Sequence, residues 1–332
     1  MKRNTNMKQT IITIIFALVT LTTTAQVNLE TNNTPGWLWE VSGNGLKQKS
    51  YLFGTCHGDG HNFTREEVLG IAGVENALKE VKTVLFEGGM DTSDVDPTAI
   101  VAEVEKLKKW LINPGPEYLM PKGTYYKPLF DTIAHFNEVT KFLSYQMKDP
   151  EYWKKNPRYW LGRLRLYIGF QLKRGTPVDV VLKQETINRG IEARYVEKRD
   201  SNMLLSMILN TEIIDTLPMK KQAESLYSIV HYINNDSLSD LYKQFAEIYL
   251  ENDTCKMESF LRGTGFVPDA EASNDIHKEI IYDRNVAWIP VIKQNIAEHP
   301  SMIAVGCRHL LGSESLIALL RREGYTINPV KY

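Results

Sequence analysis

The chain has 332 residues, with 39 Lys and Arg against 40 Asp and Glu, which gives a formal net charge of −1 at pH 7. Charges of both signs are scattered along it without a basic stripe, so the composition argues against a nucleic-acid partner. Beyond the N-terminus, no stretch approaches the ~20 apolar residues that a membrane-spanning helix needs. We therefore expect a globular mature chain that does not span a membrane.

The N-terminus has the layout of a cleaved secretory signal. A basic head, MKRNTNMKQ, precedes the apolar run TIITIIFALVTL, and small residues ending in Ala25 follow. An apolar middle of roughly 7–15 residues before a small-residue cleavage site is typical of such signals. We predict a signal peptide over 1–25 and an exported mature chain, 26–332, that is periplasmic or secreted. An uncleaved signal anchor is the alternative.

The mature chain begins with a hairpin pattern that leads into a strand–helix–strand unit. The apolar runs WLWEVSG and SYLFGT are separated by NGLKQK, which is typical of a β-hairpin. A helix is then predicted from Thr64, a plausible N-cap with Glu67 at the capping-box position. TVLFEGG predicts a buried strand that ends in Glu87 and two glycines. Such units build parallel sheets.

The remaining chain has a helical segment followed by further α/β elements. From about residue 91 to 174 the pattern is helical and rich in aromatic residues, which we interpret as core packing. Beyond it, a helix over 178–188 ends before Gly190, and strands are predicted at EARYVE, SMIAVGCRH and YTINPV, with helices between them. We expect an α/β fold with a central mixed, largely parallel sheet, helices packed around it and a helical insertion at about 91–174.

Four polar residues stand at the C-terminal ends of predicted strands: His57, Glu87, Glu197 and His309. The two histidines each close a Gly-x-x-His motif, in SYLFGTCHG and in MIAVGCRHLLG. In open α/β sheets, ligands bind in the crevice beyond this edge, so the four side chains are expected to meet there. Two imidazoles with a carboxylate form a recurrent catalytic metal arrangement.

These residues also have structural explanations. A lone histidine after a strand is usually a core or loop residue, but two in the same motif favour a shared site. Glu87 needs a partner because burying a bare carboxylate is costly, and a salt bridge to Arg284 would supply one. His61 and Asp59 are second candidates, since HGDGH resembles a metal-binding sequence without being helical.

Three cysteines, Cys56, Cys255 and Cys307, leave at least one without an intrachain disulfide partner. Two of them lie inside the Gly-x-x-His motifs. A disulfide near the site, a soft metal ligand and a small buried residue are the alternatives. The last is favoured, because free cysteine is among the most buried residue types. A thiol nucleophile at Cys56 is a weaker alternative.

Taken in order, these motifs resemble the TraB/GumN family, which also includes PrgY and the Tiki proteases. By this resemblance, the first Gly-x-x-His falls on His57, the glutamate after the second strand on Glu87, and the acid before the mid-chain helix on Asp179. The resemblance spans most of the mature chain and rests on these segments: YLFGTCH, VLFEGG, VDVVLKQETINRGIEARYVEKRDSNMLLSMI, YDRNVAW, IAVGCRHLLG and LLRREGY.

The later family positions match as well. The mid-chain Leu-Glu of the family corresponds to Val196-Glu197, the Arg-Asn of its late helix to Arg284-Asn285, and the second Gly-x-x-His to His309. The chain departs from the pattern at Asp283, where relatives often have Glu or Gln, and in its long helical middle. These departures bear on substrate choice more than on the architecture of the site.

The resemblance implies a metal-dependent hydrolase that acts on a peptide or protein. His57, Glu87 and His309 would bind one divalent ion, with Mn²⁺- or Co²⁺-like behaviour implied by the Tiki branch and Zn²⁺ possible. Glu197 would be the general base for the attacking water, and Arg284 would stabilise the developing oxyanion or clamp a carboxylate. The roles of Glu87 and Glu197 could be exchanged.

Two other functions remain open on the sequence alone. In a metal-free, esterase-like hydrolase, one histidine would activate water or a substrate hydroxyl directly, with Glu87 orienting it. In a protein that captures a peptide without cleaving it, the same residues would only bind.

Overall fold

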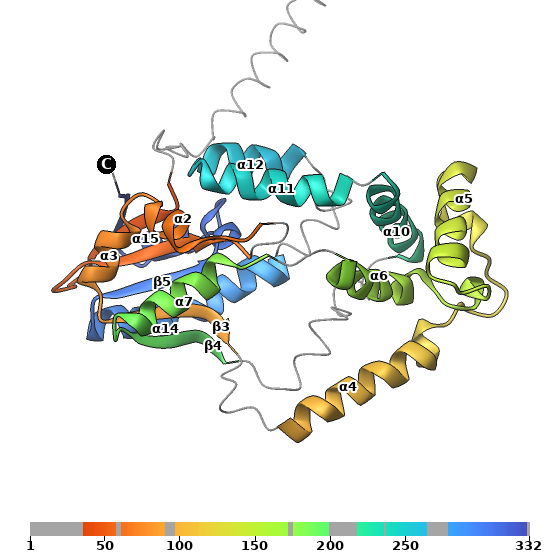
Figure 1. Ribbon diagram of the computed structural model, residues 1–332, viewed down its shortest axis with the longest axis horizontal. Coiled ribbons are helices and arrows are strands. Elements are labelled where there is room, and N and C mark those ends of the chain that lie inside the picture. Colours follow the sequence, from red (N-terminus) through yellow and green to blue (C-terminus); the bar gives the residue numbers. More distant parts are fainter. Residues whose placement is uncertain are drawn as a thin grey trace, which may run out of the picture. The chain divides into compact units, whose positions relative to one another are not determined.

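A six-stranded sheet organises the computed structural model, which describes residues 36–57, 61–89, 97–171, 175–198, 218–235, 237–263 and 278–330. The strand order is β4-β3-β5-β2-β1-β6, of which Figure 1 labels β4, β3 and β5. The first four strands of this order are parallel, and β1 is antiparallel to both of its neighbours. The mixed, largely parallel sheet is therefore confirmed. Its strands are β1 (Leu38–Gly43), β2 (Ser50–Thr55), β3 (Thr83–Gly89), β4 (Glu192–Lys198), β5 (Ser301–Gly306) and β6 (Tyr325–Pro329).

Strand β5, from near the C-terminal end of the chain, lies between β2 and β3, which follow each other near the start of the chain. The predicted hairpin β1–β2 is present, and β2 and β3 both run parallel, but β5 separates them. Register pairs Thr55 of β2 with Gly306 of β5, and Phe86 of β3 with Ala304 of β5. The two Gly-x-x-His motifs are thereby placed on adjacent strands.

Both faces of the sheet are buried, and successive strand residues alternate between two cores. On β2, Tyr51 and Phe53 belong to one core cluster and Leu52 to the other. The first cluster lies under helices α2 (Arg65–Gly70), α3 (Val74–Glu80), α7 (Val178–Asn188), α11 (Ser237–Leu250) and α12 (Thr254–Gly263). The second lies under α14 (Arg284–Glu298) and α15 (Leu316–Arg322) (Figure 1).

The helices near the sheet begin and end where their capping residues predict. Thr64 and Glu67 form the expected capping box at the start of α2. The predicted helix is broken at Gly73, which adopts φ of +83° and starts α3, so its apolar stripe is carried by two short helices. Helix α7 ends as expected before Gly190, whose φ of +67° is the left-handed conformation of a helix C-terminus.

A third core cluster is purely helical and includes Trp110, Tyr159 and Trp160. Helices between 97 and 171 build it, as expected for the helical insertion, and α10, from beyond β4, completes it with Leu226 and Val230. The domain boundaries themselves stay a prediction. The elements of this part are α4 (Pro97–Ile112), η1 (Pro116–Tyr118), η2 (Lys127–Leu129), α5 (Ile133–Lys141), η3 (Phe142–Gln146), η4 (Tyr152–Lys154), α6 (Pro157–Gln171) and α10 (Met219–Asn234).

The long helix predicted before β5 changes geometry along its length. A π-helical stretch, η5 (Lys278–Asp283), leads into α14 at Arg284, and Pro290 lies inside α14. π-helical turns within helices are frequent at functional sites. The predicted signal peptide, 1–25, lies outside the described residues. Within the described ranges, no helix is long and apolar enough to cross a membrane.

A charge network centred on the buried Glu185 ties α2 and α3 to α7. Glu185, whose side chain is 6% exposed, accepts hydrogen bonds from Arg65 and Arg189, and Arg189 also pairs with Glu75. The hydrogen bond from Arg65, followed by that from Arg189, outweighs burial and lowers the pKa of Glu185 to about 2.

We expect Glu185→Gln to lower the free energy of unfolding at pH 7 by about 1–2 kcal/mol. Because the pKa of Glu185 is lower in the folded state, its contribution is complete above the unfolded pKa of about 4.3 and disappears as the pH falls toward 2. Urea unfolding at pH 7, 5 and 3 measures this, with the surface variant Glu105→Gln as control. A difference between wild type and Glu185→Gln that stays constant down to pH 3 would contradict it.

Candidate active site

The four predicted site residues lie along the carboxyl edge of the parallel strands. Glu197 is the penultimate residue of β4, Glu87 lies near the end of β3, and His57 follows β2. His309 lies on η6 (Cys307–Leu310), a short 3₁₀ helix that follows β5. Because the strand order is β4-β3-β5-β2, the four residues follow one another along this edge in the order Glu197, Glu87, His309, His57.

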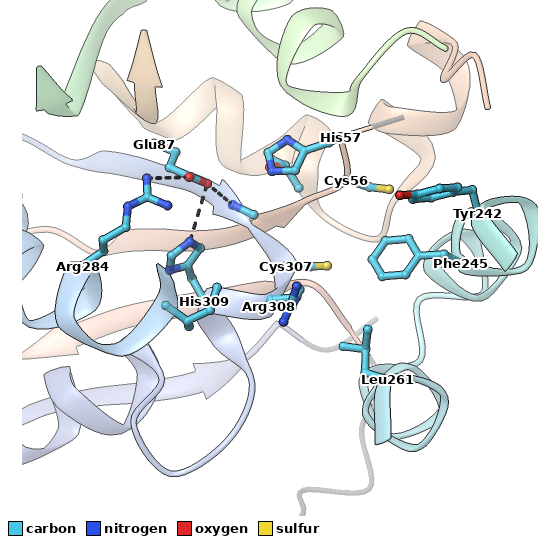
Figure 2. Close-up of a pocket in the computed structure, with 13 residues that line it drawn as sticks. Cys56, His57, Glu87, Tyr242, Phe245, Leu261, Arg284, Cys307, Arg308 and His309 are labelled. Carbon is cyan, nitrogen blue, oxygen red and sulfur yellow. Dashed lines mark hydrogen bonds and ion pairs between the residues drawn. The ribbon is translucent and has the colours of Figure 1, made fainter. Parts of the chain in front are cut away.

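Gly306 marks the point where three of these side chains converge. A Cβ atom at this glycine would lie 3.2 Å from Glu87 Oε2, 3.3 Å from His57 Nε2 and 3.6 Å from His309 Cδ2. The first glycine of the second Gly-x-x-His motif therefore leaves open a space that a carboxylate and two imidazoles surround. Figure 2 shows Glu87, His57 and His309 directed toward this space from three separate strand ends.

His309 is held in one orientation by the start of α14. Its Nδ1 lies 2.7 Å from Asn285 Oδ1, and its ring packs against Trp288 at 4.5 Å between centroids. The Asn285 amide nitrogen donates to the carbonyls of Glu314 and His309, so its oxygen is the acceptor toward the ring. This assigns the proton to Nδ1 and leaves the lone pair of Nε2 directed at Glu87 Oε2, 3.8 Å away.

His57 has a comparable support from α7. Its Nδ1 lies 3.4 Å from Asp179 Oδ2, and Thr55 donates a 2.6 Å hydrogen bond to Asp179 Oδ1. Oδ2 of Asp179 is buried and accepts no hydrogen bond within the described ranges, so His57 Nδ1 is the polar group that faces it. A carboxylate behind Nδ1 directs Nε2 of the imidazole toward Gly306. Orienting partners of this kind stand behind most metal-bound histidines.

Arg284 joins the two glutamates. Its guanidinium lies 2.7 Å from Glu87 Oε1 and 2.6 Å from Glu197 Oε2, and it stacks over Trp288 at 4.6 Å. The salt bridge considered for Glu87 is therefore present, but it occupies Oε1. The second oxygen, Oε2, accepts the backbone N–H of Gly306 and faces the histidines.

The site keeps Glu87 ionised and His309 neutral. Burial alone would raise the pKa of Glu87, but the neighbouring positive groups lower it to about 2. Burial lowers the pKa of His309 to about 4, against the opposing effect of Glu87. Because His309 is then uncharged at pH 7, the permanent charge of Arg284 is the main counter-charge to Glu87. An ionised carboxylate and a neutral imidazole are the forms that bind metal ions.

The convergence point opens into a cavity of about 290 Å³. Figure 2 shows the charged site residues on one side of this cavity and the side chains of α11 and α12 on the other. Cys56 and Cys307 also line it as buried thiols, and burial raises the pKa of Cys307 to about 12, which does not favour a thiolate nucleophile there. The residues that line the cavity are Thr55, Cys56, His57, Glu87, Tyr242, Phe245, Leu261, Ile281, Arg284, Gly306, Cys307, Arg308 and His309.

The second candidates do not join this group. His61 pairs with Glu67, the capping-box residue of α2, and packs against Phe63. Asp59 lies outside the described residues. Glu197 lines neither this cavity nor the neighbouring one beside α7.

The residues around Gly306 fit a divalent metal ion in type and orientation. Two oriented imidazoles and an ionised carboxylate surround one space that a single Cβ would fill. In the described parts of the chain, no three His, Cys, Asp or Glu side chains are close enough together to hold an ion as they stand. His57 is the most exposed of the three, with 64% of its side chain accessible.

Four supporting residues had no role assigned to them from the sequence motifs. Asp179 and Asn285 were matched to family positions, but only the structure shows that they orient the two histidines. Gly306 was recognised as part of a motif, but only the structure shows that a glycine there leaves open the space between three side chains. Thr55, which positions Asp179, gave no signal of its own.

Comparisons with known proteins identify the family of this chain. The model of the TraB/PrgY/gumN family matches residues 37–329. Among curated proteins, the chain is 24% identical to "Metalloprotease TIKI1" of Danio rerio, over 89% of this chain and 64% of that relative, so it spans less than two thirds of the relative's length. No solved structure matches the chain. With the family model covering nearly the whole described fold, from β1 to β6, the chain belongs to the TraB/PrgY/gumN family.

Proposed function

We propose that this protein is an exported, metal-dependent hydrolase that cleaves peptide bonds. The observation that carries the proposal is the convergence of Glu87, His57 and His309 on the space left by Gly306. Similarity to a relative whose printed name is metalloprotease supports the reaction class and a peptide or protein substrate. Export rests on the signal-like sequence at 1–25, with the family domain following over 26–332.

Each residue has a proposed role. His57, Glu87 and His309 hold the ion, with Asp179 and Asn285 fixing the two imidazoles. The bound ion would polarise the scissile carbonyl and acidify water. Arg284 lines the cavity and presents a fixed positive charge where negative charge develops on the substrate.

Glu197 is the proposed general base. It contacts Arg284 and lies at the same sheet edge, so the Arg284 guanidinium stands between the Glu197 carboxylate and the substrate. A base has to come within hydrogen-bond distance of the proton that it removes, and apo geometry is often looser than that of the substrate complex.

Metal content tests the first part of the proposal. We expect purified wild-type protein to contain about one divalent ion per chain, and His57→Ala and His309→Ala to lose it together with peptidase activity. Elemental analysis and cleavage of a peptide library measured by mass spectrometry give the two readouts. The control is His61→Ala, whose imidazole contacts Glu67 instead.

Activity that survives complete removal of metal by a chelator would reject this proposal in favour of a metal-free, esterase-like hydrolase. Peptides that co-purify intact with wild-type protein would favour capture without cleavage.

The space at Gly306 gives a second test. We expect Gly306→Ala to weaken metal binding at least tenfold, because the added Cβ would lie 3.2–3.3 Å from Glu87 Oε2 and His57 Nε2. Both contacts are with side-chain ends that can shift, so stability should change little. Titration with Mn²⁺ or Co²⁺ and thermal unfolding measure the two effects, and Gly70→Ala, which meets no atom within 4 Å, is the control. Unchanged metal affinity in Gly306→Ala would contradict the placement of the ion.

The role of Glu197 is tested by pH profiles. We expect Glu197→Gln to lower kcat about 10²–10⁴-fold and to remove the acid limb of the kcat/KM profile, since a general base must be deprotonated to act. Arg284→Lys keeps the positive charge and should retain that limb at a reduced rate. If both variants lose activity equally and both keep the acid limb, Glu197 acts only by positioning Arg284.

A further inference from the structure

Two cavities meet at the His57–Glu87 pair. The second has a volume of about 280 Å³ and lies beside α7 and the ends of β3 and β4, whereas the first lies beside β2, β5 and the helices α11 and α12. Because His57 and Glu87 line both, a ligand that occupies the two cavities must pass the proposed reaction centre. The second cavity is lined by His57, Phe86, Glu87, Gly88, Pro177, Asp179, Val180, Lys183 and Tyr195.

The wall of the first cavity that faces the site is apolar. Tyr242 and Phe245 come from successive turns of α11, and Leu261 comes from α12, which packs against it. Figure 2 shows these three side chains across the cavity from Glu87. Apolar walls beside a few directed polar groups are the usual build of a pocket for an apolar side chain.

The second cavity has a cationic side chain available for recognition. Lys183 donates a 2.6 Å hydrogen bond to the Tyr195 hydroxyl and lies 5.3 Å from the centre of that ring. Two carboxylates line the same cavity, and one of them, Glu87, is paired with Arg284. Asp179, one turn earlier on α7, is engaged by Thr55 and His57. An ammonium group placed in this way suits a carboxylate on a ligand.

The spacing of the strands sets the distance between the ligand groups that the two cavities bind. The second cavity is lined by residues of β4 and β3, and the first by residues of β2 and β5 as well as Glu87 of β3, so a ligand that fills both would extend over about two strand spacings along the edge. Neighbouring strands are about 4.8 Å apart, and an extended peptide advances about 3.4 Å per residue. The peptide side chains bound in the two cavities therefore belong to residues two or three positions apart.

We propose that the substrate is an extended peptide with an apolar side chain in the first cavity and, two or three residues away across the reacting bond, an acidic side chain bound by Lys183. This inference rests on the proposed function for the bond that is cleaved, but the two subsites can be tested by binding alone. The carboxylate specificity comes from Lys183, and the apolar specificity from Phe245 and its neighbours.

The test compares matched peptides that carry Asp or Asn at the acidic position and Leu or Ala at the apolar position. We expect wild-type protein to favour Asp over Asn and Leu over Ala, each at least tenfold, in Kd by fluorescence anisotropy and in kcat/KM by mass spectrometry. Lys183→Gln should abolish the Asp preference and keep the Leu preference. Phe245→Ala should do the reverse. Lys243→Gln, which removes an exposed lysine of α11, should leave both ratios unchanged.

The outcomes separate the two proposals. Cleavage without either preference would overturn the subsites and leave the hydrolase proposal intact. The expected preferences in binding, lost in the two variants but without cleavage by wild type, would support the subsites and reject the hydrolase. Tyr195→Phe keeps the ring and removes only the hydroxyl, so an Asp preference that it retains and Lys183→Gln loses assigns the effect to the ammonium group.

Discussion

The parallel pairing of β2 with β5 is the constraint on which the site depends. It places Thr55 opposite Gly306, so two motifs some 250 residues apart in the chain end side by side. Both strands are buried along their whole length, and a slip of one residue would turn their apolar side chains to the wrong core. Hydrophobic burial on two faces of the sheet therefore fixes the position of His57 relative to His309.

Around this pairing, the site is built from groups that orient one another. Each imidazole has its Nδ1 against an acceptor from a helix, Asp179 on α7 and Asn285 on α14, and these helices cover opposite faces of the sheet. Arg284 sits between two carboxylates and so keeps Glu87 ionised in a buried position. A metal ion would meet Glu87 already ionised and His309 already neutral and oriented, which lowers the cost of assembling the centre.

The positions of the candidate site residues could be predicted from the sequence because these residues follow apolar strands. Hairpin, capping box, the helix over 178–188 and the polar residues at strand ends each have a local signal, and the structure has them where the sequence places them. The space at Gly306 had no such signal. Its function comes from what surrounds it, and those neighbours are Glu87 and His57 from two other strands.

The sequence by itself determined the elements, the α/β class and the residue types at the sheet edge, since periodicity, caps and turn residues act within a few positions of the chain. Only the tertiary structure decided that β5 lies between β2 and β3, that α10 completes the helical core, and that Glu197 contacts Arg284. Strand order and such contacts depend on packing between distant segments, because apolar strands of similar length compete for the same central places. The local sequence pattern does not determine which strand takes which place in the sheet.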